Sequence, residues 1–440
     1  MNNERDSFLQ RLRAKLPGSA KLQADAAWNI LSFGLIGASG VLLILLVARY
    51  YSPEVLGRFN LVYSIYIILS QLVGAGIHFS VLRYVAEHHK NPKGHGDEGA
   101  TKVLSAALLS SMLNSLFWIG LFVISKRQLV LLFGAGDLDE GLWYIVPALF
   151  FCGQNKVLLA FLNAREEFKS YAILNATRAL VLCLVTVACV VVSVRGAVLP
   201  IVFSLSEFSL YLLLLCTTRS HISRDIDATF RTWMRMHFSF GYRSVIGSLF
   251  IDINTRIDVL VLGIYCSVHD VGVYSYAAML IDGFTQLPIV LRTIVNPKLT
   301  RAYFQEGPEA FQKVIREGRR LSYLALVPIG LLVVASYYPI VYLLHLSPEF
   351  LEGFVPLVVL MAGSLVSIGY APFLMVFNQV GKPTEQSLLY FSIFASNLLL
   401  NLLLVPYLGM LGSALGTALA YLCFVLILRI LARRKLGVNI

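Results

Sequence analysis

Three charged residues stand in the middle of an apolar stretch that is long enough to cross a lipid bilayer. The stretch runs from Gly241 to Cys266 and contains Asp252, Arg256 and Asp258. Each such charge costs about 2.5 to 3.5 kcal/mol at mid-depth on the insertion scale, whereas each large aliphatic residue returns only about 0.3 to 0.6 kcal/mol. We therefore expect the stretch to lie beside neighbouring helices or a water-filled cavity that accepts these charges.

The spacing of these residues predicts how they are arranged on a continuous helix. Asp252 and Arg256 are four positions apart and would share one face, whereas Asp258 would point elsewhere, in line with Asn254. Asp252 and Arg256 would either help line a central cavity in a transporter or form an ion pair that only fixes helix packing. Asp258 would either couple transport to a proton or cation, or serve as a buried hydrogen-bonding group.

The composition of the chain predicts its class. The 440 residues are 57% hydrophobic and only 14% charged, and the mean hydropathy is +0.73. Soluble domains carry about 25% charged residues. Apolar runs of 18 or more residues recur from Asp25 to the C-terminus, as in a polytopic helical membrane protein. The fold class that we predict is therefore all-α and membrane-spanning.

We predict twelve membrane-spanning helices, divided into two lobes of six. The expected spans are 25–48, 59–81, 103–124, 141–162, 173–194, 198–217, 243–265, 272–295, 321–345, 352–377, 387–406 and 410–430. The expected segments are a basic N-terminus 1–24, a first lobe 25–217, a linker 218–242, a second lobe 243–430 and a C-terminal tail 431–440.

The distribution of basic residues predicts the orientation of the chain. Of the 36 Lys and Arg residues, 28 lie in the predicted loops on the side of the N-terminus and five lie in the opposite loops. The positive-inside rule therefore places both termini in the cytoplasm. The net charge of +11 follows from this topology and from attraction to anionic membrane lipids, and it requires no nucleic-acid partner.

The loops and the cysteines argue against an enzyme. The longest loop on the side away from the termini, Lys126 to Glu140, is too short to house a catalytic domain, and the chain has no GxxxxGK[ST] nucleotide-binding motif. The six cysteines form no CxxC pair, so we expect neither a disulfide framework nor a metal site. We expect a transporter without a cofactor, driven by an ion gradient, the membrane potential, the gradient of its substrate or a partner.

An internal repeat indicates that the two lobes are copies of one another. Ser52-Pro-Glu-Val-Leu-Gly57 recurs as Ser267-Val-His-Asp-Val-Gly272, at an offset of 215 residues. Gln71 and Gln286 are related by the same offset, as are Asn163 and Asn378. Since six spans separate the copies, both lobes should have the same orientation, with a site near mid-depth between them.

Several motifs resemble those of a known family. The stretch Ser52 to His88, SPEVLGRFNLVYSIYIILSQLVGAGIHFSVLRYVAEH, resembles the second span of the polysaccharide transporters. These are the O-antigen and exopolysaccharide repeat-unit flippases of the multidrug/oligosaccharidyl-lipid/polysaccharide (MOP) exporter superfamily. Arg256 to Gly263, followed by Val271 to Tyr274, resembles the seventh and eighth spans of that family, and Gly381-Lys-Pro383 also fits its pattern.

The resemblance implies a fold and a function. It implies two pseudo-symmetric bundles of six helices around a central cavity, in the inner (plasma) membrane of a bacterium. It implies that the substrate is an oligosaccharide linked through pyrophosphate to undecaprenol, moved from the inner to the outer leaflet. A coupling cation (H⁺ or Na⁺), a polysaccharide polymerase and glycosyltransferases would be its partners, together with membrane lipids.

Such a substrate needs cations for its pyrophosphate and hydrogen-bonding groups for its sugars. We expect the substrate cavity to contain Arg256, Asp252, Arg178, Gln71, Gln286, Asn397 and Asn401. Asp258, Glu207 and Asp282 are the candidates for coupling to a proton or a cation. Lys156 and Arg292 are interpreted as cations that reach toward the inner lipid headgroups.

Two alternative functions remain open at this stage. A cation-coupled multidrug exporter of the same superfamily would need an acidic and aromatic cavity, whereas the deep charges here are mixed. A membrane enzyme of cell-envelope assembly would need the large outer loops that this chain lacks.

Overall fold

The computed structural model describes residues 20–89, 96–223, 228–438 and 440. Most of the predicted basic N-terminus 1–24 and residues 224–227 of the predicted linker lie outside the described residues. Within the described residues, nine helices are long and apolar enough to cross a membrane. The protein is therefore a multi-pass helical membrane protein, as the composition predicts.

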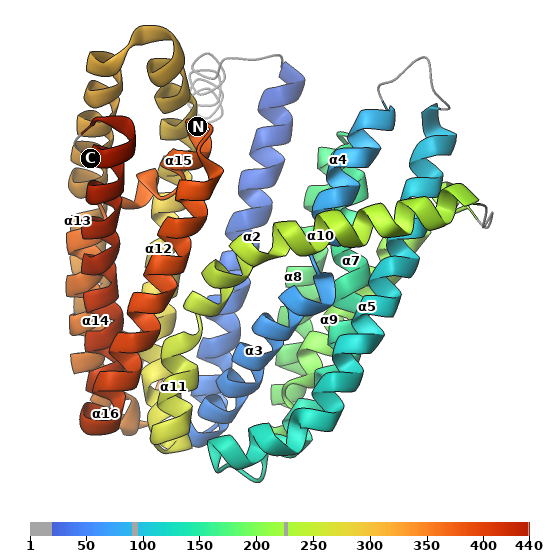
Figure 1. Cartoon of the computed structure of the whole chain (residues 1–440). Coiled ribbons are helices and arrows are strands. Elements are labelled where there is room, and N and C mark those ends of the chain that lie inside the picture. Colours follow the sequence, from blue (N-terminus) through green and yellow to red (C-terminus); the bar gives the residue numbers. More distant parts are fainter. Residues whose placement is uncertain (1–19, 90–95, 224–227, 439) are drawn as a thin grey trace, which may run out of the picture.

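The first half of the chain forms one group of helices, shown in blue to green in Figure 1. Its longest helices run along a common direction, and α2 packs beside α8. The elements are α2 (Ala20–Tyr50), α3 (Pro53–Gly74), α4 (Ile77–His89), α5 (Gly96–Phe133), α6 (Leu138–Tyr144), α7 (Val146–Ala164), α8 (Phe168–Val191), η1 (Gly196–Val198), α9 (Ile201–Thr218) and η2 (Arg219–His221).

The second half forms a group shown in yellow to red, and α10 crosses between the two groups (Figure 1). The elements are α10 (Ala228–Asn254), α11 (Ile257–Tyr265), α12 (Val268–Arg301), η3 (Ala302–Glu306), α13 (Pro308–Leu343), η4 (Pro348–Gly353), α14 (Phe354–Ser367), η5 (Ala371–Phe373), α15 (Val376–Gln379) and α16 (Pro383–Leu436).

The expectation of one helix for each span fails at several places. Predicted span 141–162 is divided between α6 and α7, and predicted span 352–377 is divided among η4, α14, η5 and α15. Predicted span 59–81 is broken after Gly74, where Ala75 and Gly76 adopt positive φ angles. Predicted span 243–265 is broken between α10 and α11. The two last spans, 387–406 and 410–430, lie on α16, which is kinked at Gly409.

The linker helix α10 is fixed to the first half of the chain. The imidazole of His237 is fully buried and lies 2.6 Å from the Ser80 hydroxyl on α4 and 3.1 Å from the Val103 carbonyl on α5. Gly241 packs directly on the break between α3 and α4, because a Cβ atom there would lie 2.4 Å from the Ala75 carbonyl oxygen. The start of α10 is therefore anchored to the first group of helices.

The two halves meet where α3 and α12 begin, at the end of the molecule away from the N and C labels in Figure 1, which we call the distal end. A Cβ atom on Gly57 would lie 2.0 Å from the Val268 carbonyl oxygen, and one on Gly272 would lie 1.8 Å from the Pro53 carbonyl oxygen. These reciprocal contacts, which we call the glycine seal, join residues related by the 215-residue repeat. Only residues without a side chain allow the two backbones to approach this closely.

Candidate functional site

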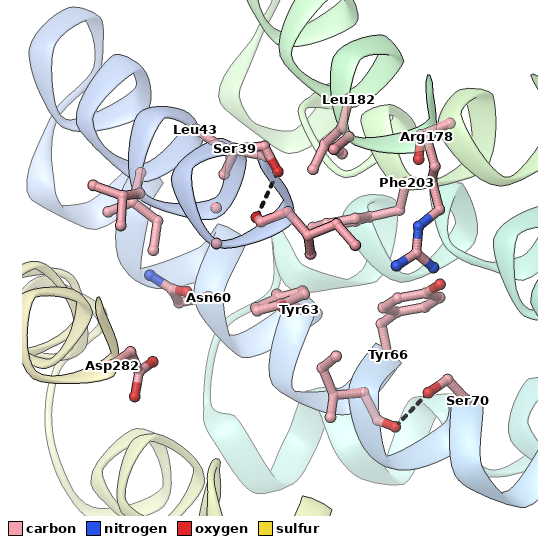
Figure 2. Close-up of a pocket in the computed structure, with 18 of the residues that line it drawn as sticks. Ser39, Leu43, Asn60, Tyr63, Tyr66, Ser70, Arg178, Leu182, Phe203 and Asp282 are labelled. Atoms are coloured by element: carbon pink, nitrogen blue, oxygen red, sulfur yellow. Dashed lines mark hydrogen bonds between the residues drawn. The ribbon is translucent and has the colours of Figure 1, made fainter. Parts of the chain in front are cut away.

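A cavity of about 400 Å³, which we call the central chamber, lies mainly among the helices of the first half and is closed on one side by α12. Its wall comes from α2, α3, α7, α8 and α9, with Arg256 and part of α12 on the opposite side. Figure 2 shows Arg178 on one side of the cavity and Asp282 across from it. A cavity of this size is in the range of ligand-binding pockets.

Helix α3 supplies a row of polar and aromatic side chains to the central chamber. Asn60, Tyr63 and Tyr66 repeat every three residues, so they lie on one face of the helix, with Ser70 one turn further along (Figure 2). Phe203 of α9 stacks on Tyr63 and Tyr66, at ring-centroid distances of 5.1 and 5.3 Å. The chamber therefore has an aromatic wall that carries hydroxyl and amide groups.

Glu207 on α9 is held by polar partners on every side. Its Oε1 atom forms an ion pair with Arg178 at 3.2 Å and accepts a hydrogen bond from the Tyr66 hydroxyl at 3.1 Å. Its Oε2 atom accepts a hydrogen bond from the Asn155 amide at 2.7 Å. Glu207 is only 3% exposed, so removing Arg178 would leave the buried carboxylate without its counter-ion.

Arg256 links the two halves of the chain. It lies in the break between α10 and α11, where its guanidinium is 3.4 Å from the Asp282 carboxylate of α12 and 4.8 Å from the ring centre of Tyr63 on α3. Its Nε atom is buried and has no hydrogen-bond partner among the described residues. The guanidinium is therefore positioned by an aromatic face and one carboxylate, and part of its donor capacity is unused.

Lys156 on α7 differs from the two arginines in having only neutral partners. Its Nζ atom donates hydrogen bonds to the Ser70 carbonyl at 2.7 Å and to the Gln71 side chain at 3.1 Å. Among the described residues, no carboxylate lies within ion-pair distance of this ammonium. This partly buried ammonium, which forms no ion pair among the described residues, contributes a positive potential that favours an anionic ligand.

The charges that border the central chamber are therefore three cations, Lys156, Arg178 and Arg256, against two carboxylates, Glu207 and Asp282. Both carboxylates are paired with an arginine. The remaining positive charge belongs to Lys156. The amides of Gln71 and Gln286 border the same chamber from α3 and α12, as the repeat predicts for symmetric positions.

A second cavity of about 350 Å³, which we call the C-terminal chamber, lies among α10, α11, α12, α14 and α16. Asp282 and Gln286 border both chambers. Asp258 reaches only the C-terminal chamber, where it accepts hydrogen bonds from the Tyr274 hydroxyl at 2.7 Å and from the Val259 amide at 2.9 Å. The Asp258 carboxylate is therefore already provided with two donors.

A chain of amide hydrogen bonds supports the C-terminal chamber. Asn397 donates to the Asn254 side chain at 3.2 Å, and Asn401 donates to the Asn397 side chain at 2.8 Å. Ser413 then donates to Asn401 at 3.1 Å. Asn397 borders the chamber, whereas Asn401 is fully buried behind it. This network fixes α16 against the end of α10.

The structure brings most of the predicted site residues to the two chambers, with two exceptions and one correction. Arg256, Arg178, Gln71, Gln286, Glu207 and Asp282 border the central chamber, and Asn397, Asp258, Asp282 and Gln286 border the C-terminal chamber. Asp252 and Asn401 border neither.

The prediction that Asp252 and Arg256 share one helical face is wrong, and Arg256 pairs with Asp282 in place of the Asp252 ion pair that was one of the two expected roles. The four-residue spacing assumes a continuous helix, but α10 ends at Asn254 and Arg256 has non-helical φ and ψ angles of −129° and 0°. The break turns the Arg256 side chain toward Asp282 and Tyr63. Thr255 stabilises the break, because its hydroxyl donates to the Asp252 carbonyl oxygen at 2.7 Å and competes with the helical ladder.

Sequence reasoning also missed residues of the central chamber. It interpreted Lys156 as a cation that extends to the lipid headgroups, whereas the side chain bends toward the carbonyl end of α3. It did not select the α3 row of Asn60, Tyr63 and Tyr66. The three-residue spacing of these polar side chains within an apolar span was the available signal.

Comparisons with known proteins agree with this architecture. The model of the family described as "Polysaccharide biosynthesis protein" matches residues 22–302. No curated protein sequence matches the chain significantly.

Solved structures of transporters share the fold. An inward-facing multidrug resistance MATE family transporter of the MOP superfamily is 16% identical over 93% of this chain and 98% of its own, with a TM-score of 0.75. The lipid II flippase MurJ in an inward closed conformation is 17% identical over 92% and 87%, with a TM-score of 0.73. A MOP superfamily transporter from Pyrococcus furiosus, described by the reverse polarity of its binding pocket, is 14% identical over 95% of both chains, with a TM-score of 0.62.

The family model covers well over half of the chain, and the solved structures are matched over nearly its whole length. The protein is thus a member of the polysaccharide biosynthesis protein family, and its helices adopt the fold of the MOP superfamily transporters.

Proposed function

We propose that this protein moves lipid-linked oligosaccharides, with undecaprenyl pyrophosphate as the carrier, from the inner to the outer leaflet of a bacterial plasma membrane. The apolar tail of such a molecule can stay in the bilayer, but its charged and hydroxylated head cannot cross the lipid unaided. The observation that carries the proposal is the central chamber, where the Lys156 ammonium forms no ion pair with any described residue. Membership in a polysaccharide biosynthesis family supports it.

The chamber offers suitable groups to each part of the head. The guanidinium of Arg256 and the ammonium of Lys156, which both border the chamber, would bind the phosphoryl oxygens. The aromatic faces and polar groups of Tyr63, Tyr66 and Asn60 would pack against and hydrogen-bond the sugars. A cavity of about 400 Å³ accommodates part of an oligosaccharide and leaves the remainder to extend along the opening.

We infer the orientation of the protein in the membrane from the distribution of its charges. The loops near both termini hold most of the Lys and Arg residues, so the positive-inside rule makes the distal end the outer face. The lobes 25–217 and 243–430 would then rock so that the glycine seal opens and closes, with the linker helix α10 carried by the first lobe through His237. The close contacts of the glycine seal would keep this proposed outer side closed in the present structure.

Among the three coupling candidates, we propose Asp282. Glu207 and Asp258 each receive two or more hydrogen bonds or ion pairs from neighbouring residues. The Asp282 side chain is 48% exposed, borders both chambers and makes a single contact with Arg256 at 3.4 Å. Binding of a proton or Na⁺ to Asp282 would free Arg256 to bind the substrate. Binding of the ion and binding of the substrate would then favour the same state of the protein. The polymerase and the glycosyltransferases would act before and after this step as partners.

The test is substrate selection in proteoliposomes. The wild-type protein should expose a defined undecaprenyl-pyrophosphate oligosaccharide to an outside lectin faster than empty liposomes do. It should not accumulate ethidium, a cationic probe of multidrug export, because the chamber has an excess of positive charge. Transport of ethidium without movement of the lipid-linked sugar would replace this proposal with a multidrug exporter.

A further inference from the structure

The C-terminal chamber is bordered by charged residues, one of which, Arg292, does not border the central chamber. Asp258 and Asp282 border one part of it, and Arg292 on α12 borders another, ten residues beyond Asp282. Ten residues of α-helix correspond to about 15 Å. Most of the other side chains in the wall are aliphatic or aromatic, including Ile251, Ile289 and Phe424.

The Arg292 guanidinium is poorly satisfied by the protein. Its one hydrogen bond goes to the Ala371 carbonyl at a distance of 3.4 Å. Its Nε atom is buried and has no partner. Among the described residues, no carboxylate lies within ion-pair distance of it, although arginine offers five N–H donors. An arginine with this much unused donor capacity is suited to bind an oxyanion.

Tyr390 on α16 contributes a second unused donor at the same place. The side chain borders the chamber and is only 7% exposed, yet its hydroxyl has no hydrogen-bond partner among the described residues. Tyr390 and Arg292 border the same chamber from α16 and α12. Most buried hydroxyl groups have a partner, and an unsatisfied one costs about 1 to 3 kcal/mol. Two such groups in the wall of one cavity favour a ligand that supplies acceptor oxygens.

We propose that the C-terminal chamber is a second binding site, for the phosphoryl group of a single- or multi-chain anionic lipid. The phosphoryl oxygens accept hydrogen bonds from Arg292 and Tyr390, and the first part of the lipid chain lies along Ile289 and Phe424. An apolar wall directly beside an unsatisfied arginine excludes a fully hydrophilic anion as the best ligand. Arg292 and Tyr390 do not border the central chamber, and the proposal does not require that the protein transports anything.

The experiment counts bound ligands on the full-length protein in detergent by native mass spectrometry. Farnesyl phosphate is the probe, because it combines a phosphoryl group with a short isoprenoid chain, and farnesol and inorganic phosphate are the comparisons. Wild-type protein should bind two farnesyl phosphate molecules, one in each chamber. The Arg292→Gln variant should bind one, with the affinity for the second molecule reduced at least about tenfold. Tyr390→Phe should weaken the second molecule less, because it removes only one donor.

Arg301→Gln is the matched control, since Arg301 is an exposed arginine on the same helix and borders neither chamber. Lys156→Gln should remove the other farnesyl phosphate molecule, so the two sites are measured separately. Loss of a bound molecule only in Lys156→Gln would refute the C-terminal site. Loss of a bound molecule only in Arg292→Gln would refute the phosphoryl site in the central chamber. Two molecules bound to Arg292→Gln would overturn the inference, as would equal binding of farnesol. Competition by lysophosphatidylglycerol assigns the site to bilayer lipids, and its failure to compete assigns the site to isoprenoid phosphates.

Discussion

Replacing Gly57 by alanine should open the distal end of the protein. The new Cβ atom would lie 2.0 Å from the Val268 carbonyl oxygen and 2.9 Å from the Gly272 nitrogen. Carbon and carbonyl oxygen atoms normally approach to about 3.3 Å, so α3 and α12 must separate by more than about 1 Å. Both close atoms belong to backbone, which cannot turn aside as a flexible side chain can.

The size of the effect follows from the cost of such overpacking. Forcing an extra methyl group into a tight contact costs about 1 to 3 kcal/mol. Since about 1.4 kcal/mol corresponds to a factor of ten, the ratio of distal-open to distal-closed molecules should rise about 5- to 150-fold. Gly272→Ala should have the same effect, because its Cβ atom would lie 1.8 Å from the Pro53 carbonyl oxygen.

Pulsed electron paramagnetic resonance measures this shift directly. Spin labels would be placed at Arg127→Cys and Glu352→Cys, which are exposed positions on opposite halves of the distal end. The native cysteines, all of them free, would be replaced by alanine in this background. Gly57→Ala should increase the population at long distance. Gly120→Ala is the control, because a Cβ atom on Gly120 meets nothing within 4 Å. A distance distribution in Gly57→Ala that equals that of the control would refute the role of the glycine seal.

Two further changes test the central chamber. Tyr63→Leu should weaken farnesyl phosphate binding in the central chamber about two- to fivefold, because Arg256 loses the aromatic face that positions it. Tyr63→Phe keeps that face and should bind normally. Equal binding by the Leu and Phe variants would contradict this. Glu207→Gln should destabilise the protein by about 1 to 3 kcal/mol, because buried hydrogen bonds to the carboxylate are weakened and Arg178, whose side chain is 34% exposed, loses its ion pair. Arg178→Gln in the same chain should restore part of the loss. Thermal unfolding in detergent measures this, and an unchanged melting temperature of Glu207→Gln would show that the ion pair contributes nothing.

The internal repeat predicted the parts of the fold that depend on symmetry. Gly57 and Gly272 were matched by sequence offset alone, and the structure places them in reciprocal contact. Gln71 and Gln286 were matched by the same offset and border one chamber. A repeat records positions that are equivalent with respect to the axis between the lobes, so residues near that axis are the ones that it predicts well.

The details that failed depend on local breaks in helices. Helical spacing cannot predict the direction of Arg256, because the chain leaves the helix between Asn254 and Ile257. The break is held by the Thr255 hydroxyl and by the hydrogen bond between Asn254 and Asn397, and the latter partner is distant in sequence. The local sequence therefore contains only part of the information that determines where α10 ends and how Arg256 is directed.

Lys156 illustrates a different reason for failure. Its distance from the end of the predicted span favoured an ammonium that reaches the lipid headgroups. In the structure the ammonium finds acceptors within the protein, the Ser70 carbonyl and the Gln71 side chain near the C-terminal end of α3. Gly74 leaves the room for this, since a Cβ atom there would lie 3.1 Å from Lys156 Cδ. The position of Lys156 thus depends on a residue without a side chain in another helix.

The most direct measurement is the rate at which reconstituted protein exposes an undecaprenyl-pyrophosphate oligosaccharide, compared between wild type and the Lys156→Gln/Arg256→Gln variant. Hydrogen bonds to charged groups contribute about 1.5 to 3 kcal/mol each, so the rate should fall at least about tenfold in the variant, while Arg301→Gln should keep the wild-type rate. Equal rates in the wild type and the variant, at equal amounts of folded protein in the liposomes, would contradict the assignment of the central chamber as the site for the phosphoryl head.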